Sequence, residues 1–213
     1  MRSSSEPTDN ESLEAKYKRR HQTVLMRLAD ALAIHIRDCM EGHPRIDRIS
    51  ARSKGVDRFL KKAGTTLVDG RLKYTEPLTQ IQDQIGARIV LFYKSDVEEI
   101  DAQVKRYFRA IEYHKIVPDS ESEFGYFGHH LVLVLPTDII EPDMDQTLIP
   151  EVFELQIKTL FQHAWSEADH DLGYKPGEKL LTKEQKRLVA FTAAQAWGAD
   201  HIFDQLFLER NAD

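Results

Sequence analysis

The sequence predicts an α+β fold in which one mixed β-sheet of about five strands is flanked by helices. Two kinds of segment alternate along the chain: stretches whose apolar residues recur at helical spacing, and short apolar runs bounded by polar residues. The clearest runs are residues 87–93 (ARIVLFY) and 131–135 (LVLVL), which have the length of buried strands. Helices that alternate with buried strands are typical of a sheet covered by helices.

The helices are expected to begin after a polar, Ser-rich stretch, residues 1–12, which we predict to be a disordered tail. Helical spacing of the apolar residues then predicts helices over residues 13–40, 56–63, 78–86, 96–108, 160–172 and 182–209. Gly42 and Pro44 end the first of these helices. Thr182 and Gln185 have the spacing of a capping box, so the last helix is expected to start there. Its apolar residues occupy more than one face, which indicates burial or a surface for a partner, including a second copy of the chain.

The expected strands fill the intervals between the helices. They are predicted at residues 46–49, 87–93, 111–117, 131–135 and 152–158. The intervening stretch of residues 137–150 is polar and is expected to be a loop.

Composition sets the class of protein. The chain has 213 residues, of which 41% are hydrophobic and 30% charged, so we expect one soluble domain over residues 13–213. The single cysteine, Cys39, has no partner for an intrachain disulfide, which favours a reducing compartment, and no apolar run is long enough to span a bilayer. We therefore expect a cytoplasmic protein without a membrane anchor. A net charge of -6 argues against a general nucleic-acid coat protein.

One segment is strongly basic in an otherwise acidic chain. Between Arg45 and Lys62 there are seven Lys or Arg residues against two Asp, a local balance of +5. A concentration of positive charge of this kind suits a polyphosphate ligand. The alternative is a solvated helix face, which is what most charge runs are.

Two acidic residues stand out by their placement near strands. Asp83 comes just before the strand at residues 87–93, and Glu154 interrupts the apolar pattern of the strand at residues 152–158. A charge on a core strand is costly unless it is paired or binds a metal. Two carboxylates at neighbouring strands can hold one Mg²⁺ together with substrate phosphates. The alternative is a structural ion pair of Glu154 with Lys158 or with a nearby arginine.

A segment rich in glycine, aromatic rings and imidazoles, residues 124–130 (FGYFGHH), precedes the strand at residues 131–135. Its glycines permit close approach of the backbone, and the ring of Tyr126 can stack on a base, worth about 1–3 kcal/mol. The alternative is a tight turn with Tyr126 packed in the core.

The helix at residues 160–172 carries a possible metal-binding pattern. His163, Glu167 and His170 lie near one face, but the HExxH order of zinc proteases is absent, so we do not expect zinc.

Taken together and in order, these segments resemble the synthetase domain of the RelA/SpoT family, the alarmone synthetases. The resemblance covers roughly residues 48–175 and rests on several motifs in the right order. The family's R-x-K segment is similar to Arg52-Ser53-Lys54, with its later lysine at Lys62; D-x-x-G-x-R to Asp83, Gly86 and Arg88; G-Y-x-S-x-H to Gly125, Tyr126, Gly128 and His130; E-x-Q-I-R-T to Glu154, Gln156, Ile157, Lys158 and Thr159; and W-x-x-x-x-H to Trp165 and His170. The fold that the resemblance implies is a mixed sheet with flanking helices, related to nucleotidyltransferases.

The resemblance also implies a role for each matching residue on the ATP side. Arg52 and Arg88 would sandwich the adenine of ATP. Lys54 and Lys62 would bind its phosphates.

The metal and the second nucleotide have their own implied residues. Asp83 and Glu154 would hold Mg²⁺, and Glu154 would accept the proton of the attacking 3′-hydroxyl. The residues expected around the acceptor nucleotide are Tyr126, which stacks on its base, His130, Gln156, Lys158 and His163. The implied reaction transfers the β,γ-pyrophosphate of Mg-ATP to the 3′-hydroxyl of GDP or GTP, which makes this a GTP/GDP diphosphokinase and a stand-alone alarmone synthetase.

Three departures from the family pattern concern the acceptor. Gly128 stands where the family has Ser, and Lys158 stands for Arg and loses its bidentate geometry. The stretch of residues 119–123 (DSESE) is acidic where synthetases tend to carry lysine, and it should repel a free 5′-diphosphate. Two alternatives therefore stay open: a toxic member of the family that pyrophosphorylates tRNA 3′ ends or adenine nucleotides and needs an antitoxin, and a nucleotide-binding regulatory module with weak catalysis.

Overall fold

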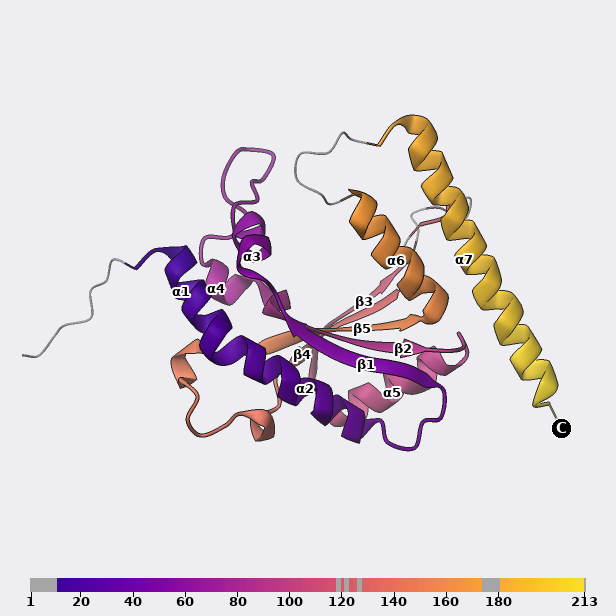
Figure 1. Ribbon diagram of the computed structural model, residues 1–213, viewed down its shortest axis with the longest axis horizontal. Coiled ribbons are helices and arrows are strands. Elements are labelled where there is room, and N and C mark those ends of the chain that lie inside the picture. Colours follow the sequence, from indigo (N-terminus) through magenta and orange to yellow (C-terminus); the bar gives the residue numbers. More distant parts are fainter. Residues whose placement is uncertain (1–10, 118–119, 121–122, 126–127, 174–180, 213) are drawn as a thin grey trace, which may run out of the picture.

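The computed structural model describes residues 11–117, 120, 123–125, 128–173 and 181–212 (Figure 1). Its five strands form one sheet in the order β1-β2-β5-β4-β3. They span Ile46–Ser53 (β1), Ile85–Leu91 (β2), Ala110–Ile116 (β3), Gly128–Val134 (β4) and Val152–Thr159 (β5). β2 and β5 run parallel, whereas the other neighbours are antiparallel, so the mixed five-stranded sheet expected from the sequence is confirmed.

The helices cover both faces of this sheet. They span Leu13–Arg20 (α1), Met26–Cys39 (α2), Val56–Ala63 (α3), Pro77–Gln80 (α4), Asp96–Tyr107 (α5), Leu160–Gly173 (α6) and Lys183–Arg210 (α7). α2 and α5 lie on one face, and α6 lies on the other with α7 alongside it (Figure 1). The α+β class is confirmed. Among the described residues, no helix is both long and apolar enough to cross a bilayer.

Alternation along the central strands separates the core from the opposite face. On β5, Phe153, Leu155 and Ile157 are fully buried against the helices of the first face. Glu154 and Gln156 lie between them and must point to the other face, because successive side chains of a strand alternate. Glu154 therefore breaks the apolar pattern without entering the core.

The first long helix is confirmed but contains an irregularity. α1 and α2 are joined by one π-helical segment, His21–Leu25, which keeps the helical path continuous. α1 begins at Leu13 as predicted, because Ser12 accepts a hydrogen bond from the Ala15 amide at 3.2 Å and caps the helix. Residues 1–10 of the predicted tail lie outside the described residues.

The short helix predicted at residues 78–86 is wrong in extent. α4 ends at Gln80, and Ile81 has extended dihedral angles (φ -84°, ψ 103°) that stop it. A single 3₁₀ turn, Gln82–Gln84, follows. Ile85 and Gly86 already belong to β2, because their backbones pair with the end of β1. Pairing with a neighbouring strand overrode the helical spacing of the apolar residues.

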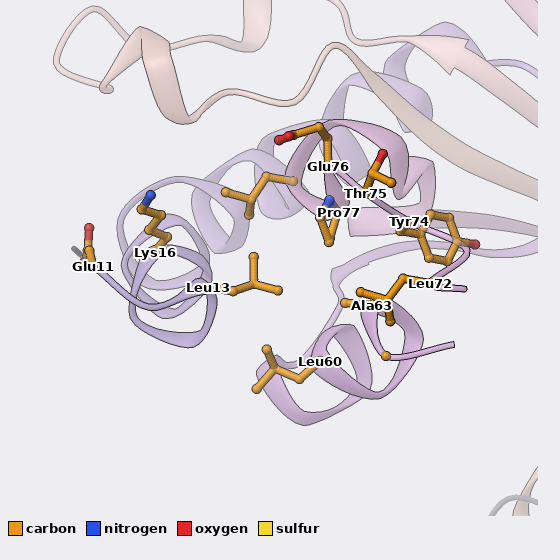
Figure 2. Close-up of a pocket in the computed structure, with 12 residues that line it drawn as sticks. Glu11, Leu13, Lys16, Leu60, Ala63, Leu72, Tyr74, Thr75, Glu76 and Pro77 are labelled. Carbon is orange, nitrogen blue, oxygen red and sulfur yellow. The ribbon is translucent and has the colours of Figure 1, made fainter. Parts of the chain in front are cut away.

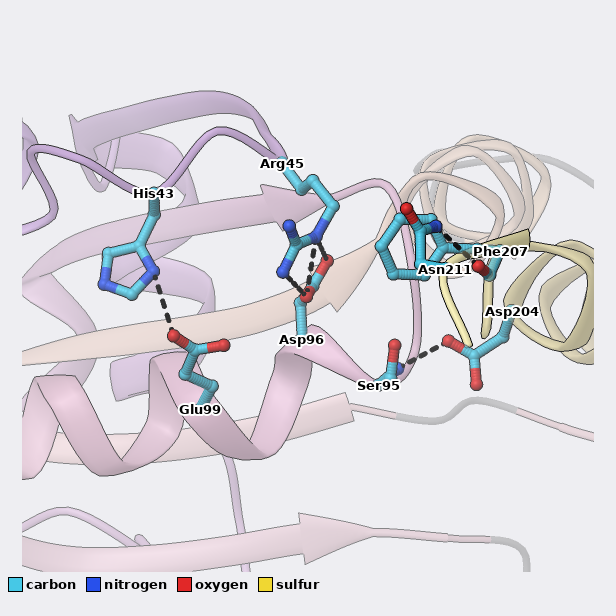
Figure 3. A network of polar contacts seen from close by, with 8 residues as sticks. All are labelled: His43, Arg45, Ser95, Asp96, Glu99, Asp204, Phe207 and Asn211. Atoms are coloured by element: carbon cyan, nitrogen blue, oxygen red, sulfur yellow. Dashed lines mark hydrogen bonds and ion pairs between the residues drawn. The ribbon is translucent and has the colours of Figure 1, made fainter. Parts of the chain in front are cut away.

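The last helix begins with the predicted capping box, in which Thr182 and Gln185 exchange hydrogen bonds. Its far end docks on the segment between β2 and α5 (Figure 3): the Asp204 carboxylate accepts from the Ser95 amide at 2.7 Å, and the ring of Phe207 lies 5.0 Å from the Arg45 guanidinium, itself paired with Asp96. Large apolar side chains of α7 that stay exposed are Leu188, Phe191, Trp197, Ile202, Phe203, Leu206 and Leu208. The use of this helix in a homo-oligomer stays a prediction.

Candidate functional site

A polar cleft of about 420 Å³ opens where the end of β1, the start of α3 and the middle of β5 meet. Its lining includes Arg52, Ser53, Lys54, Gly55, Val56, Asp57, Arg58, Asp83, Gly86, Glu154 and Gln156. Strand register explains the convergence: Arg52 pairs with Gly86, and Gly86 pairs with Glu154, so these three residues form one row across the sheet. Cations and carboxylates from distant parts of the sequence thus face one space.

A larger hollow of about 550 Å³ lies elsewhere, between α1, α3 and residues 72–78 (Figure 2). Most of its lining is apolar, as with Leu13, Leu60 and Leu72, and its few charged groups lie at the edge of α1 and at Glu76. Size alone does not make an active site, which needs convergent polar groups. We therefore assign the chemistry to the smaller polar cleft.

Asp83 is held by two lysines within the polar cleft. Lys54 Nζ lies 2.9 Å from Asp83 Oδ2, and Lys62 Nζ lies 3.0 Å from Asp83 Oδ1. The lysines come from different elements, the turn after β1 and the last turn of α3. The sequence expected both lysines on phosphates and Asp83 on a metal; the structure brings all three together.

The first helix fixes the position of Lys54. The Tyr17 hydroxyl donates to the Lys54 carbonyl at 2.7 Å, and the Lys54 amide donates to the Gln84 carbonyl at 2.8 Å. The ring of Tyr17 is fully buried and stacks on Phe59 with the centroids 3.6 Å apart. Burial raises the pKa of Tyr17, so its hydroxyl stays a donor at neutral pH. α1 thus holds the turn that carries Lys54.

Glu154 receives its contacts from the neighbouring strand and from its own. His130 Nδ1 on β4 lies 3.4 Å from Glu154 Oε1, and Gln156 Nε2 donates to the same oxygen at 2.6 Å. Burial by itself would raise the pKa of Glu154, but the hydrogen bonds from His130 and Gln156 lower it to about 2. The carboxylate is therefore ionised at neutral pH. The alternative partner Lys158 instead donates to Ser166 Oγ at 3.1 Å.

The donor set of the cleft suits Mg²⁺ bound together with a substrate. Asp83 and Glu154 line the same space, and both supply the hard oxygen ligands that Mg²⁺ takes. Within the described part of the chain, no group of three or more His, Cys, Asp or Glu residues could hold a metal by itself. Two carboxylates fit an ion that completes its shell with phosphates and water.

Arg88 connects the sheet to α6. One nitrogen, Nη1, lies 2.8 Å from Glu167 Oε1 and 3.0 Å from His163 Nδ1. Burial lowers the pKa of His163, and the positive charge of Arg88 adds to this effect. The sequence expected Arg88 on ATP and His163 on the acceptor, so this contact joins the two predicted halves of the site.

Lys158 lies beneath α6 with 3% of its surface exposed. Burial, reinforced by the charge of Arg88, lowers the pKa of Lys158 to about 7. Close to neutral pH this amine exists in both protonation states, which an arginine at the same place would not do.

The predicted site residues fall into three groups. Those that line the polar cleft are Arg52, Lys54, Asp83, Glu154 and Gln156. Those that contact a lining residue or a residue of α6 are Lys62, Arg88, His130, Lys158 and His163. Tyr126 lies outside the described residues. Tyr17 and Ser166 were missed because their contacts come from tertiary packing alone. Glu167 was seen only as a weak metal pattern, and its position one helical turn after His163 was the usable signal.

A family model described as the region found in RelA/SpoT proteins matches residues 51–179. The matched range includes every residue that lines the polar cleft. The chain belongs to the RelA/SpoT family. The RelA/SpoT resemblance seen in the motifs is therefore confirmed, and the cleft lies on the segment that defines the family.

Individual RelA/SpoT relatives agree with this assignment. The chain is 25% identical over 153 residues to GTP pyrophosphokinase YjbM of Bacillus subtilis (strain 168), covering 70% of this chain and 66% of that protein. The structure of small alarmone synthetase 1 from Bacillus subtilis matches with a TM-score of 0.68 at 24% identity, over 91% of this chain and 97% of that one. The same synthetase solved with its product pppGpp matches with a TM-score of 0.69 at 20% identity, over 92% and 97% of the two chains. At these identities the solved structures establish the fold.

Proposed function

We propose that this RelA/SpoT-family protein transfers the β,γ-pyrophosphate of Mg-ATP to the 3′-hydroxyl of GDP or GTP and so makes (p)ppGpp. The observation that carries the proposal is the convergence of Asp83 and Glu154 with Arg52, Lys54 and Lys62 at one polar cleft. The relative named a GTP pyrophosphokinase and the related synthetase bound to pppGpp support the choice of acceptor.

The reaction forms one bond and breaks another. The 3′-oxygen of the acceptor attacks the β-phosphorus of ATP, and the bond from that phosphorus to the α,β-bridging oxygen breaks, so AMP leaves with the electron pair. Lys54 and Lys62 would neutralise charge on the phosphates, which lowers the barrier because that charge shifts during transfer. A bound Mg²⁺, held by Asp83 and Glu154, would supply Lewis-acid stabilisation of the same charge.

We assign proton removal from the 3′-hydroxyl to Glu154, provided that the contacts that lower its pKa change when the acceptor binds. A pKa of about 2 makes this carboxylate a weak base, because efficient proton transfer needs a pKa near the working pH. Two of the groups that lower it are His130 and Gln156, and both are expected to bind the acceptor. If they turn to the substrate, Glu154 loses their hydrogen bonds, which removes two of the influences that lower its pKa.

The test follows the label from γ-labelled ATP in parallel reactions with GDP, GTP, ATP alone and deacylated tRNA. We expect labelled guanosine 3′-pyrophosphates. Label on tRNA or on an adenine nucleotide would replace the acceptor by that of the toxic alternative, and binding of nucleotide without transfer would support the regulatory module. Glu154→Gln and Asp83→Asn should each abolish transfer. Wild-type rates in either variant would refute the proposed site.

Magnesium dependence is tested separately. Removal of divalent cations with a chelator should stop transfer, and added Mg²⁺ should restore it. A cytoplasmic location and an antitoxin partner stay predictions from the sequence.

A further inference from the structure

The inner face of α7 buries a carboxylate at the start of α6. Asp200 is 4% exposed, and its Oδ2 accepts a hydrogen bond from the Thr159 hydroxyl at 2.7 Å. Thr159 is the last residue of β5 and is fully buried. It also caps α6, because its hydroxyl accepts from the Gln162 amide at 3.2 Å while its own amide donates to Gln162 Oε1 at 3.1 Å. Asp200 therefore fixes the residue that sets where α6 begins.

Burial of this carboxylate lowers the free energy of unfolding, although its hydrogen bond holds the start of α6. Burial raises the pKa of Asp200 to about 6, even though the Thr159 hydrogen bond and the nearby His201 and Lys94 oppose the rise. Its second oxygen, Oδ1, is buried and makes no hydrogen bond with the described residues. Residues that cost stability in a well-packed region are often found where function needs a defined geometry.

A second contact ties α7 to the segment that precedes β4. Trp197, one turn before Asp200, meets the ring of Phe124 edge to face, with the centroids 5.8 Å apart and the planes at 69°. The adjacent Gly125 lines a hollow of about 20 Å³ together with Trp165, Trp197 and Asp200. The same short stretch of α7 therefore contacts both the segment before β4 and the start of α6.

We propose that Asp200 and Trp197 are positioning residues for the acceptor half of the site. Asp200 would set the place of α6, which carries His163 and Ser166, and Trp197 would hold Phe124 and Gly125. This inference rests on the proposed function, because the acceptor half is defined by it. On the ATP side, Lys54 is held without α7, by Tyr17 of α1 and by the backbone next to Asp83, while Arg88 contacts α6 through Glu167.

The experiment compares Asp200→Ala, Asp200→Asn and Trp197→Leu with Asp204→Ala as the matched control. Asp204 lies on the same helix and also accepts a hydrogen bond, but from Ser95 on the segment between β2 and α5 (Figure 3). For each variant the KM of the acceptor, the KM of ATP, kcat and the melting temperature are measured on the full chain.

Asp200→Ala and Trp197→Leu should each raise the KM of the acceptor by roughly tenfold, because a small misplacement of a binding group has effects of this order or larger. Trp197→Leu should leave the KM of ATP within about twofold. Asp200→Ala should raise the KM of ATP by no more than about two- to fivefold, because α6 also carries Glu167, which holds Arg88. Asp200→Asn keeps an oxygen for Thr159 and should restore the KM of the acceptor. Asp204→Ala should lower the melting temperature without separating the two KM values.

Three results would overturn the inference: equal rises in both KM values, the same separation in Asp204→Ala, or no recovery in Asp200→Asn. If Asp200→Ala does not fold, the two KM values of Trp197→Leu and of Asp200→Asn still test the inference. Should the wild-type protein transfer no label, the proposed function fails, and calorimetric binding of GDP and of ATP to the same variants tests the positioning role without turnover. Unchanged GDP affinity in Trp197→Leu and Asp200→Ala would then refute it.

Discussion

Replacing Asp200 by Asn should change how the stability of the protein depends on pH. The folded protein raises the pKa of Asp200 from 3.8 to about 6, because the carboxyl is buried. Between these two values the folded state binds more protons than the unfolded state, so this group lowers the free energy of unfolding as the pH rises. Above the folded pKa the effect is complete, and it is lost again below the unfolded pKa.

The size of the effect follows from the shift. About two pKa units correspond to about 3 kcal/mol of destabilisation at pH 8, of which about half is already present at pH 5. The Asn variant lacks this titration. Its amide nitrogen takes the place of an oxygen that makes no hydrogen bond with the described residues, which costs about 1–3 kcal/mol, but that cost does not vary with pH. The change in the difference between the two proteins is therefore the quantity to measure.

The assay is urea denaturation of wild type and Asp200→Asn at several pH values from 5 to 8. The variant should gain about 1–2 kcal/mol relative to wild type over this range, equivalent to roughly 2–8 °C in melting temperature for a chain of this size. Thr159→Val serves as a control that loses the hydrogen bond but keeps the buried carboxylate. A difference between wild type and Asp200→Asn that stays constant from pH 5 to 8 would refute the reasoning.

Three further predictions concern the two halves of the site. Because the pKa of Lys158 is lowered to about 7, the KM of the acceptor should rise between pH 6 and 8.5 as this amine loses its proton. Lys158→Arg should flatten that rise, because arginine keeps its charge. If the KM of the acceptor in steady-state kinetics varied with pH in the same way in both proteins, the assignment would be contradicted. Glu167→Gln removes the carboxylate that holds Arg88 and should raise the KM of ATP about two- to fivefold, as expected for a half-exposed ion pair; an unchanged KM would show that Arg88 is oriented without it. Tyr17→Phe keeps the stacked ring but removes the donor to the Lys54 carbonyl, so the free energy of unfolding should fall by about 1–2 kcal/mol and the KM of ATP should rise more than that of the acceptor, which thermal melts and kinetics together would check.

The sequence allowed the fold to be predicted well where local pattern and tertiary pairing agree. The strand at residues 152–158 and the capping box at Thr182 were both predicted, and both are present in the structure. The short helix before Gly86 failed because its apolar residues fit helical spacing, yet the strand β1 pairs with the same backbone. Boundaries of this kind depend on a partner that lies far away in the sequence.

Motif spacing selects the candidate site residues, whereas their arrangement is seen only in the folded chain. Motif spacing identified Asp83 and Lys54, but only the folded chain shows that they form an ion pair. The ion pair between Arg88 and Glu167 joins two residues that lie more than seventy positions apart in the sequence, and no local pattern predicts such a contact. The burial of Asp200 was likewise invisible, since an acid on a mixed helix face is ordinarily solvated.

The π-helical segment His21–Leu25 affects the direction in which the side chains of α1 face as well as the length of the first helix. The Met26 amide donates to the His21 carbonyl five residues earlier, so this wide turn holds one residue more than an α-helical turn, and removal of one residue would restore the regular i→i−4 pattern. Tyr17 would then still face the turn at Lys54, while α2 kept its packing on the sheet. A single-residue deletion here is therefore expected to keep the support of the ATP-side lysine, because the wide turn absorbs the missing residue.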